Sequence, residues 1–233
     1  MTHLGRLALM MFALMVFGSG ALRAQAIQSD PLEGFNRTMF GFNLTLDQYV
    51  VEPVATAYVK AVPEPLRNMV GNFFGNIGDV WSAANHALQG KPGPAFHMMG
   101  RAFINTSVGL LGVLDVATVS GIERQSEDFG QTLGVWGVNS GPYLVLPLLG
   151  PSTLRDAVAT PLDRSIYNHT LPQETEPRAW LTAAQVINGR ANALPYTRML
   201  DKVALDKYVF VRDTSHSNRL LWLHTRNTSR SFA

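Results

Sequence analysis

The sequence predicts a mainly α-helical fold, with many short amphipathic helices in a single domain and little or no β-sheet. Three observations predict it. Apolar residues recur at helical spacing over much of the chain, strand patterns are few, and no repeat, low-complexity tract or linker divides the 233 residues.

An apolar stripe defines the first helix. Its start is expected at Asp30 and Pro31, because aspartate caps helices well and proline fits their first turn. The apolar residues then follow at alternating spacings of three and four: Leu32, Phe35, Met39, Phe42, Leu46 and Tyr49. A helix so rich in phenylalanine and methionine lies either in a core or in a membrane interface.

Prolines and glycines divide the rest of the chain into further elements. Pro53 is expected to open a second helix and Pro63 a third, in which Gly71 and Gly75 permit close contact with a neighbouring helix. Residues 161–170 are expected to be irregular. The remaining elements are a helix to about Leu88, helices over Ala95–Leu110, Ser152–Ala159, Thr175–Leu194 and Asp206–His224, and one candidate strand, Tyr143–Leu146.

A run of 26 uncharged residues, Phe129–Leu154, is the most unusual part of the chain. Its length and apolarity suit a bilayer, but five glycines and three prolines exclude a single spanning helix. Uncharged, glycine-broken backbone at membrane depth is stable only where protein or a cavity covers its polar groups. The run therefore predicts a protein that handles apolar molecules. The alternative is the buried centre of a soluble core.

Residues 1–26 have the features of a secretory signal peptide. Arg6 provides the positive charge, an apolar stretch follows it, and small residues precede Ala26. Cleavage there, or less favourably after Ala24, is expected. Cleavage after Ala26 leaves 233 − 26 = 207 residues, enough for one domain with its own core. The alternative is a retained N-terminal anchor.

The mature chain is expected to consist of two parts. Residues 27–213 form the helical domain, and residues 214–233 form a basic tail. The positive charge of the tail suits anionic lipid headgroups or an acidic partner. The alternative is a solvated helix face.

The residues carry no recognisable enzyme chemistry. The chain has no cysteine, which removes thiol catalysis, zinc–thiolate sites and cysteine acylation. The five histidines after the signal never fall three or four residues apart, and no phosphate-binding glycine loop occurs. Ser140 lies fourth rather than third in GVNSG, so the hydrolase nucleophile elbow is absent. No enzyme activity, cofactor, metal or nucleic-acid partner is expected.

Several stretches, taken in order, resemble the MlaA (VacJ) family of Gram-negative outer-membrane proteins. They are DPLEGFNRTMFGFN at 30–43, VPEPLRNMVGNFFGN at 62–76, ALQGKP at 87–92, FINTSVGLLGVLDVAT at 103–118 and EDFGQTLGVWGVNSGPYLVLPLLGPSTLRD at 127–156, with a weaker match, DKYVFVRD, at 206–213. The resemblance covers most of Asp30 to Asp213, and its longest motifs have unusual compositions.

The resemblance implies a ring-like helical protein with an amphipathic channel, lying in the inner leaflet of the outer membrane beside trimeric porins. The implied role is to remove mislocalised phospholipids from the outer leaflet and pass them to a periplasmic carrier of the MlaC type, without bond chemistry. Family members usually carry an acylated cysteine after the signal, and this chain has none. We therefore expect membrane association without lipidation, through its own apolar surface and a porin. The alternative is a periplasmic protein that only visits the membrane.

Phospholipid transport requires a covered route, because exposing about thirty chain methylenes to water costs on the order of 20 kcal/mol. The uncharged run combines apolar side chains with uncharged polar groups, so we predict that it lines or hinges this route. The candidate lipid-path residues are Gln131, Asn139, Ser140, Tyr143, Leu144, Leu146, Leu148 and Leu149.

The candidates for membrane-interface helices are Phe35, Arg37, Met39, Phe42, Phe73 and Phe74. Arg37 is expected near lipid phosphates, unless it pairs with Glu33, four residues earlier. Two other functions stay open. One is a periplasmic binding or chaperone module for acyl chains or apolar peptides, and the other is a lipid hydrolase.

Overall fold

The structure is a computed structural model that describes residues 30–215. The expected signal peptide and the tail beyond its first two residues lie outside the described residues. The chain divides into two units, Met1–Pro31 and Leu32–Ala233. Almost all described residues belong to the second unit.

The second unit is mainly α-helical, as the sequence predicts. Its helices are α2 (Glu33–Leu46), the π-helix η1 (Asp47–Val51), α3 (Glu52–Ala61), α4 (Glu64–Leu88), α5 (Pro92–Ser107), α6 (Val116–Val119), α7 (Phe129–Val135), α8 (Leu154–Thr170) and α9 (Thr175–Val203). Residues 207–215 are also helical. Among the described residues, one antiparallel hairpin interrupts the helices, formed by β1 (Tyr143–Leu146) and β2 (Gly150–Thr153).

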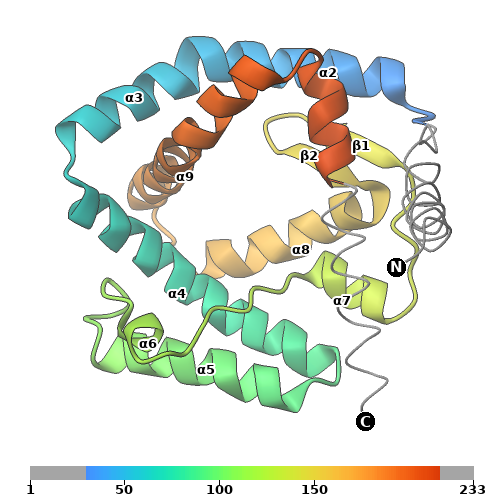
Figure 1. Cartoon of the computed structure of the whole chain (residues 1–233). Helices are drawn as coiled ribbons and strands as arrows, with labels where there is room; N and C mark the ends of the chain where they lie inside the picture. Colours follow the sequence, from blue (N-terminus) through green and yellow to red (C-terminus); the bar gives the residue numbers. More distant parts are fainter. Residues whose placement is uncertain (1–29, 216–233) are drawn as a thin grey trace, which may run out of the picture. The chain divides into compact units, whose positions relative to one another are not determined.

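The elements of this unit close a circuit. Helix α2 contacts β1, β1 contacts α8, α8 contacts α4, α4 contacts α9, and α9 contacts α3, which returns through η1 to α2 (Figure 1). Helix α5 lies against α4 and carries α6. The circuit therefore joins elements that are far apart in the sequence.

A proline causes the π-helix between α2 and α3. Pro53 has no N–H and its ring clashes with the carbonyl one turn back, so the regular hydrogen-bond ladder cannot pass through it. The helix widens over η1 instead of ending, and the α-helix α3 follows at Glu52 with Pro53 in its first turn, close to where the sequence places a helix start. One wide turn brings Asp47 and Glu52 to the same guanidinium. Arg190 of α9 bonds Asp47 twice at 2.7 Å and lies 3.5 Å from Glu52.

Glycines of α4 allow its neighbours to approach closely. A Cβ atom at Gly71 would lie 3.4 Å from Asn188 Nδ2 of α9, and one at Gly78 would lie 2.6 Å from the Tyr167 hydroxyl of α8. At Gly75 it would overlap the guanidinium of Arg124. Gly71 thus contacts a neighbouring helix as the sequence suggested, whereas Gly75 makes room for Arg124, which lies in the segment between α6 and α7.

A buried guanidinium joins α4, α5 and α6. Arg101 is 0% exposed and donates to Asp79 at 3.2 Å and to both oxygens of Asp115 at 3.0 Å. Its remaining N–H groups bond Thr118 and the carbonyl of Ile122. A charge without access to water is stable only when it is paired and hydrogen-bonded. This cluster therefore fixes how the three helices meet.

The partner carboxylate Asp115 stays ionised. Burial raises its pKa, but hydrogen bonds from Thr118 and Asn105 and the charge of Arg101 outweigh burial and lower the pKa to about 2. The stability that these bonds contribute is therefore complete above the ordinary pKa of 3.8 and is lost as the pH falls toward 2.

Polar side chains fill much of the interior, while many large apolar ones face outward. The hydrophobic clusters are small: one holds Ala55, Ala191 and Leu194, and the other Tyr143, Val145 and Tyr208. By contrast, Phe96 of α5 is 79% exposed and Phe103 is 71% exposed. The other large apolar side chains with at least 65% exposure are Tyr49, Val108, Leu110, Leu111, Val119, Leu148, Val158, Trp180, Tyr196, Met199 and Leu205.

Several sequence-based boundaries are wrong. Helix α2 begins at Glu33 with Leu32 as its N-cap, two residues later than expected. Residues 161–170 are helical, because α8 continues through Pro161. Helix α9 likewise continues through Pro195, and residues 150–153 form a strand before α8 begins. In α8 and α9, contacts with distant elements override the local signal.

Arg101→Met should destabilise the fold strongly. It removes the buried guanidinium that bonds both Asp79 and Asp115, and although Arg124 still bonds Asp79 at 2.7 Å, breaking a buried ion pair costs about 3–5 kcal/mol. Urea unfolding followed by helical circular dichroism measures the loss. Arg164→Met, at an exposed position of α8, is the control and should change the free energy of unfolding by less than about 0.5 kcal/mol. Equal losses in the two variants would contradict the assigned role of Arg101.

Candidate functional site

The uncharged run folds into a short helix, a loop and a hairpin. Helix α7 begins after Asp128, whose carboxylate accepts a hydrogen bond from Gln131 N at 2.7 Å. In the hairpin, Tyr143 pairs with Thr153 and Leu146 with Gly150, which leaves a three-residue turn. Thr153 then caps α8 by accepting from Asp156 N. The run is therefore no single spanning helix, as its glycines and prolines predict.

Two asparagines of α2 hold the outer edge of β1. Asn36 is fully buried; its Nδ2 donates to Tyr143 O at 3.0 Å, and its Oδ1 accepts from Val145 N at 2.8 Å. Asn43 bonds Leu146 O at 2.9 Å and Leu148 N at 2.8 Å in the same way. Each carboxamide supplies one donor and one acceptor, as a neighbouring strand would. A helix thereby occupies the edge that another strand would otherwise pair with.

The turn of the hairpin presents two leucines outward. Leu148 has a left-handed backbone, with φ of 64°, and its side chain is 68% exposed. A left-handed conformation costs about 1–2 kcal/mol for a residue with a Cβ. The bond from Leu148 N to Asn43 Oδ1 helps to hold it there. Leu149 beside it is also exposed.

Asp163 of α8 connects the run to the circuit. Its Oδ1 accepts from Trp81 Nε1 of α4 at 2.7 Å and from Phe129 N of α7 at 3.0 Å. Burial raises the pKa of Asp163, the neighbouring charges of Asp128 and Asp156 raise it further, and the two hydrogen bonds oppose the rise. One carboxyl group thus sets the position of α7 against two long helices.

The structure separates the candidate lipid-path residues into three environments. Tyr143 is buried in the cluster with Val145 and Tyr208. Leu144 and Leu146 are half-buried on the other side of β1, and Gln131 is half-buried on α7, where it bonds Asp128. The exposed candidates are Asn139, Ser140, Leu148 and Leu149. Their role in a lipid path stays a prediction.

Of the candidate interface residues, Phe35 and Phe42 are exposed on α2, whereas Met39 packs against the Tyr143 cluster. On α4, Phe74 is buried and Phe73 is half-buried, with their rings in edge contact at 5.3 Å. Their membrane contact also stays a prediction.

Arg37 is exposed and forms the ion pair with Glu33, at 2.8 Å, that was the alternative to a phosphate contact. A second carboxylate, Asp206, lies 3.0 Å away, and the guanidinium lies over the ring of Tyr208. Hydrogen bonds to Glu33 and Asp206 raise the pKa of Arg37. The predicted phosphate contact of Arg37 stays untested.

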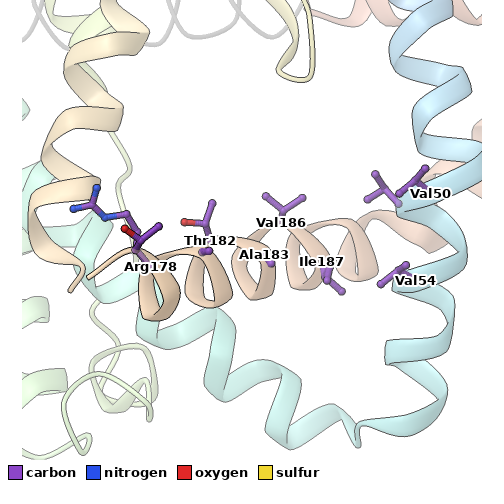
Figure 2. Close-up of a pocket in the computed structure, with 10 residues that line it drawn as sticks. Val50, Val54, Arg178, Thr182, Ala183, Val186 and Ile187 are labelled. Carbon is purple, nitrogen blue, oxygen red and sulfur yellow. The ribbon is translucent and has the colours of Figure 1, made fainter. Parts of the chain in front are cut away.

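Sequence reasoning missed an apolar groove between η1, α3 and α9. Its volume is about 610 Å³, and it is lined by Val50, Val51, Val54, Thr175, Arg178, Ala179, Thr182, Ala183, Val186 and Ile187. Figure 2 shows Arg178 at one end of this row and Val50 and Val54 at the other. The α9 residues recur every three or four positions, a signal that the sequence contains but that is hard to separate from an ordinary buried face.

Within residues 30–215, no group of three or more histidine, aspartate or glutamate side chains is placed to hold a metal ion. No described helix combines the length and apolarity that crossing a membrane requires.

The fold and the site define a mainly helical protein whose elements close a circuit that includes one helix-bound hairpin. A family model described as "MlaA lipoprotein" matches residues 28–221, so the chain belongs to the MlaA family. The resemblance identified from the sequence is thereby confirmed.

Curated relatives from Shigella flexneri, Escherichia coli and Haemophilus influenzae carry the name "Intermembrane phospholipid transport system lipoprotein MlaA". The one from Escherichia coli (strain K12) is 47% identical over 133 residues, which cover 55% of this chain and 53% of the relative. The one from Haemophilus influenzae is 33% identical over 195 residues, covering 82% and 78%. The match thus spans about half the length of the Escherichia coli relative.

A solved structure described as "Structural basis for maintenance of bacterial outer membrane lipid asymmetry" has a similar fold. The TM-score is 0.69 with 36% sequence identity, and the match covers 82% of this chain and 97% of the solved one. The chain therefore shares its fold with this solved structure.

Asn36→Leu should release β1 from α2. The change leaves Val145 N and Tyr143 O without their partners, and a buried unpaired polar group costs about 1–3 kcal/mol. Amide hydrogen exchange at Val145 should accelerate by about tenfold or more, since each 1.4 kcal/mol is a factor of ten. Asn139→Leu, in the exposed loop, should leave this exchange rate unchanged. Unaltered protection in Asn36→Leu would show that the hairpin does not depend on these bonds.

Proposed function

We propose that this protein is a component of intermembrane phospholipid transport. In this proposal it removes mislocalised phospholipids from the outer leaflet of the outer membrane and passes them to a periplasmic carrier, which maintains lipid asymmetry. The observation that carries the proposal is the distribution of side chains: many charged and polar groups are buried, and many large apolar groups face outward. The family relationship supports it, because curated relatives are named as phospholipid-transport proteins.

The outward apolar groups support contact with lipid. Soluble monomers rarely expose large contiguous apolar surfaces. On α5, Phe96, Met99 and Phe103 lie on one face together with Val80 of α4. Such a face is stable when acyl chains rather than water surround it.

The loop after α5 supports the same interpretation. Leu110 and Leu111 have φ of 53° and 60°, and both side chains are exposed. Bonds from Leu111 N to Thr106 O and from Gly112 N to Asn105 O hold this strained backbone. A strained backbone that turns two leucine side chains outward supports a surface that contacts apolar molecules.

The proposed location is the periplasmic side of the outer membrane, in its inner leaflet, beside a trimeric porin and within reach of an MlaC-like carrier. Since these 233 residues contain no cysteine, we propose that the apolar surface supplies the attachment. The uncharged run is proposed to line or hinge the lipid route, because α2 and α8 hold it at defined positions.

The deciding experiment uses a strain that lacks its own family member, complemented with this chain. Outer-leaflet phospholipid and detergent sensitivity are measured. Complementation should restore both to the parental level. Failure of a well-expressed, exported chain to lower outer-leaflet phospholipid would overturn the proposal.

Leu144→Asp and Leu146→Asp should block lipid removal in this strain while leaving porin association intact. A carboxylate on this half-buried face of β1 would be costly for passing acyl chains and is expected to lower transport by about tenfold or more. Copurification with porin tests association. Asn168→Asp places a carboxylate at an exposed polar position of α8 outside the run and should complement like wild type. Normal transport by folded versions of both β1 variants would show that the hairpin does not line the lipid route.

Phe96→Ser combined with Phe103→Ser should weaken membrane binding. Fully burying one phenylalanine is worth about 1.5–3 kcal/mol, so binding to phospholipid vesicles should fall by about tenfold or more. Flotation of purified protein with vesicles measures it. Phe96→Leu with Phe103→Leu keeps the surface apolar and should float nearly as well as wild type. Unchanged flotation of the serine variant would locate membrane contact elsewhere.

A further inference from the structure

The groove between η1, α3 and α9 has the form of a slot for one hydrocarbon chain. Its α9 wall runs from Thr175 to Ile187, which at 1.5 Å per residue is about 18 Å of helix. The hydrocarbon layer of one leaflet is about 15 Å thick, half of a core of about 30 Å. An extended acyl chain therefore matches the length of the slot.

Small and branched side chains keep the groove open. Ala55 of α3 and Ala191 of α9 are buried together where the two helices meet. N-terminal to this contact, Ala179 and Ala183 leave space along α9, and Val50 and Val54 form the far wall. Because α9 carries alanines here rather than leucines, the gap beside its helical turns is left unfilled.

The charged side chain of the groove lies near one end. Arg178 lies opposite the valine end in Figure 2. Its guanidinium donates to Pro172 O at 3.3 Å and to Gln173 Oε1 at 2.7 Å. Within residues 30–215, it forms no ion pair with a carboxylate. Its positive charge is therefore uncompensated beside the groove, as a site for a phosphate requires.

The lining favours a lipid over a peptide. Besides Arg178, the polar side chains are only Thr175 and Thr182, on the same wall. A peptide would need partners for its N–H and C=O groups along the whole groove, whereas an acyl chain needs none. The chemistry of the lining therefore corresponds to one acyl chain that ends in an anion.

We infer that this groove binds one acyl chain of a phospholipid, with the chain end between Val50, Val54 and Val186 and the phosphate at Arg178. The inference rests on the proposed function and adds to it a binding site outside the uncharged run. A lipid held here by one chain keeps its second chain outside the groove, so the site serves as a station on the route rather than a closed binding cavity.

The test uses the purified full chain with vesicles of phosphatidylethanolamine and phosphatidylglycerol. A small fraction of the phosphatidylethanolamine carries a photoreactive group on one acyl chain. After irradiation, mass spectrometry locates the labelled residues. Labels should gather at Val50–Val54 and Ala179–Ile187. Labels spread evenly over the exposed apolar surface, or crosslinks from the groove to the chain's own segments, would overturn the inference.

Two tryptophan variants form a matched pair. Ala183→Trp fills the groove and should lower labelling there by about tenfold or more. Ala184→Trp, at the next position, is also exposed but does not line the groove, and it should label like wild type. Equal labelling of a folded Ala183→Trp and of wild type would overturn the inference.

The role of Arg178 has its own control. Arg178→Gln should lower labelling by the phospholipid probe, while a photoreactive diacylglycerol, which lacks the phosphate, should label both proteins equally. Arg198→Gln, on the same helix outside the groove, should have no effect. Lower labelling of Arg178→Gln by both probes would show that Arg178 does not bind the phosphate. Displacement of the phospholipid probe by palmitate, but not by unlabelled phospholipid, would assign the groove to fatty acids and overturn the inference.

Complementation separates this inference from the proposed function. If wild type lowers outer-leaflet phospholipid and Ala183→Trp does so equally well, the groove inference falls and the proposed function stands. If wild type itself fails, the proposed function falls. Specific labelling in vesicles would then still support the groove as a lipid site.

Discussion

Arg101 is completely buried, and the rest of the structure depends on the constraint it illustrates: directional polar contacts, rather than a large apolar core, join the elements. Asn36 joins α2 to β1, Asp163 joins α8 to α4 and α7, and Arg190 joins α9 to η1. Each of these groups fits only one arrangement of its partners, because a buried donor or acceptor left unpaired is costly. The circuit of elements is thereby fixed at its junctions, while the two hydrophobic clusters remain small.

This arrangement leaves the apolar residues available for the surface. In a water-soluble domain, side chains such as Phe96 and Phe103 would fill the core, and their burial would provide the main driving force for folding. Apolar surroundings would give them that stabilisation. In the proposed location a bilayer supplies such surroundings, and it would also strengthen the polar junctions, because competing water is scarce. The polar interior and the apolar exterior are then both explained by one environment.

The sequence predicts the fold class well and the junctions poorly. Helical periodicity located α2 and much of α4, and the apolar run of Tyr143–Leu146 located β1, because these signals are local. Pro161 and Pro195 misled the assignment, since Asp163 and Tyr167 anchor the second half of α8, and Arg190 with Thr197 supports α9 across its proline. Asn36 and Asn43 have an evident spacing of two helical turns. Their partners, however, lie more than a hundred residues away, so no local pattern shows that they replace a strand.

In the candidate site, too, the feature formed by neighbouring residues could be predicted, and the feature formed by distant residues could not. The uncharged run was recognisable because twenty-six residues without charge are rare in a chain of this composition. The groove was not, because Val50 and Val54 belong to one helical run and Ala183 and Val186 to another, more than a hundred positions later. Arg190 bonds Asp47 and Glu52, which the π-turn before Pro53 brings to one side, and Ala55 packs against Ala191 where α3 meets α9. These contacts together hold α9 against α3, and the apolar groove lies beside them.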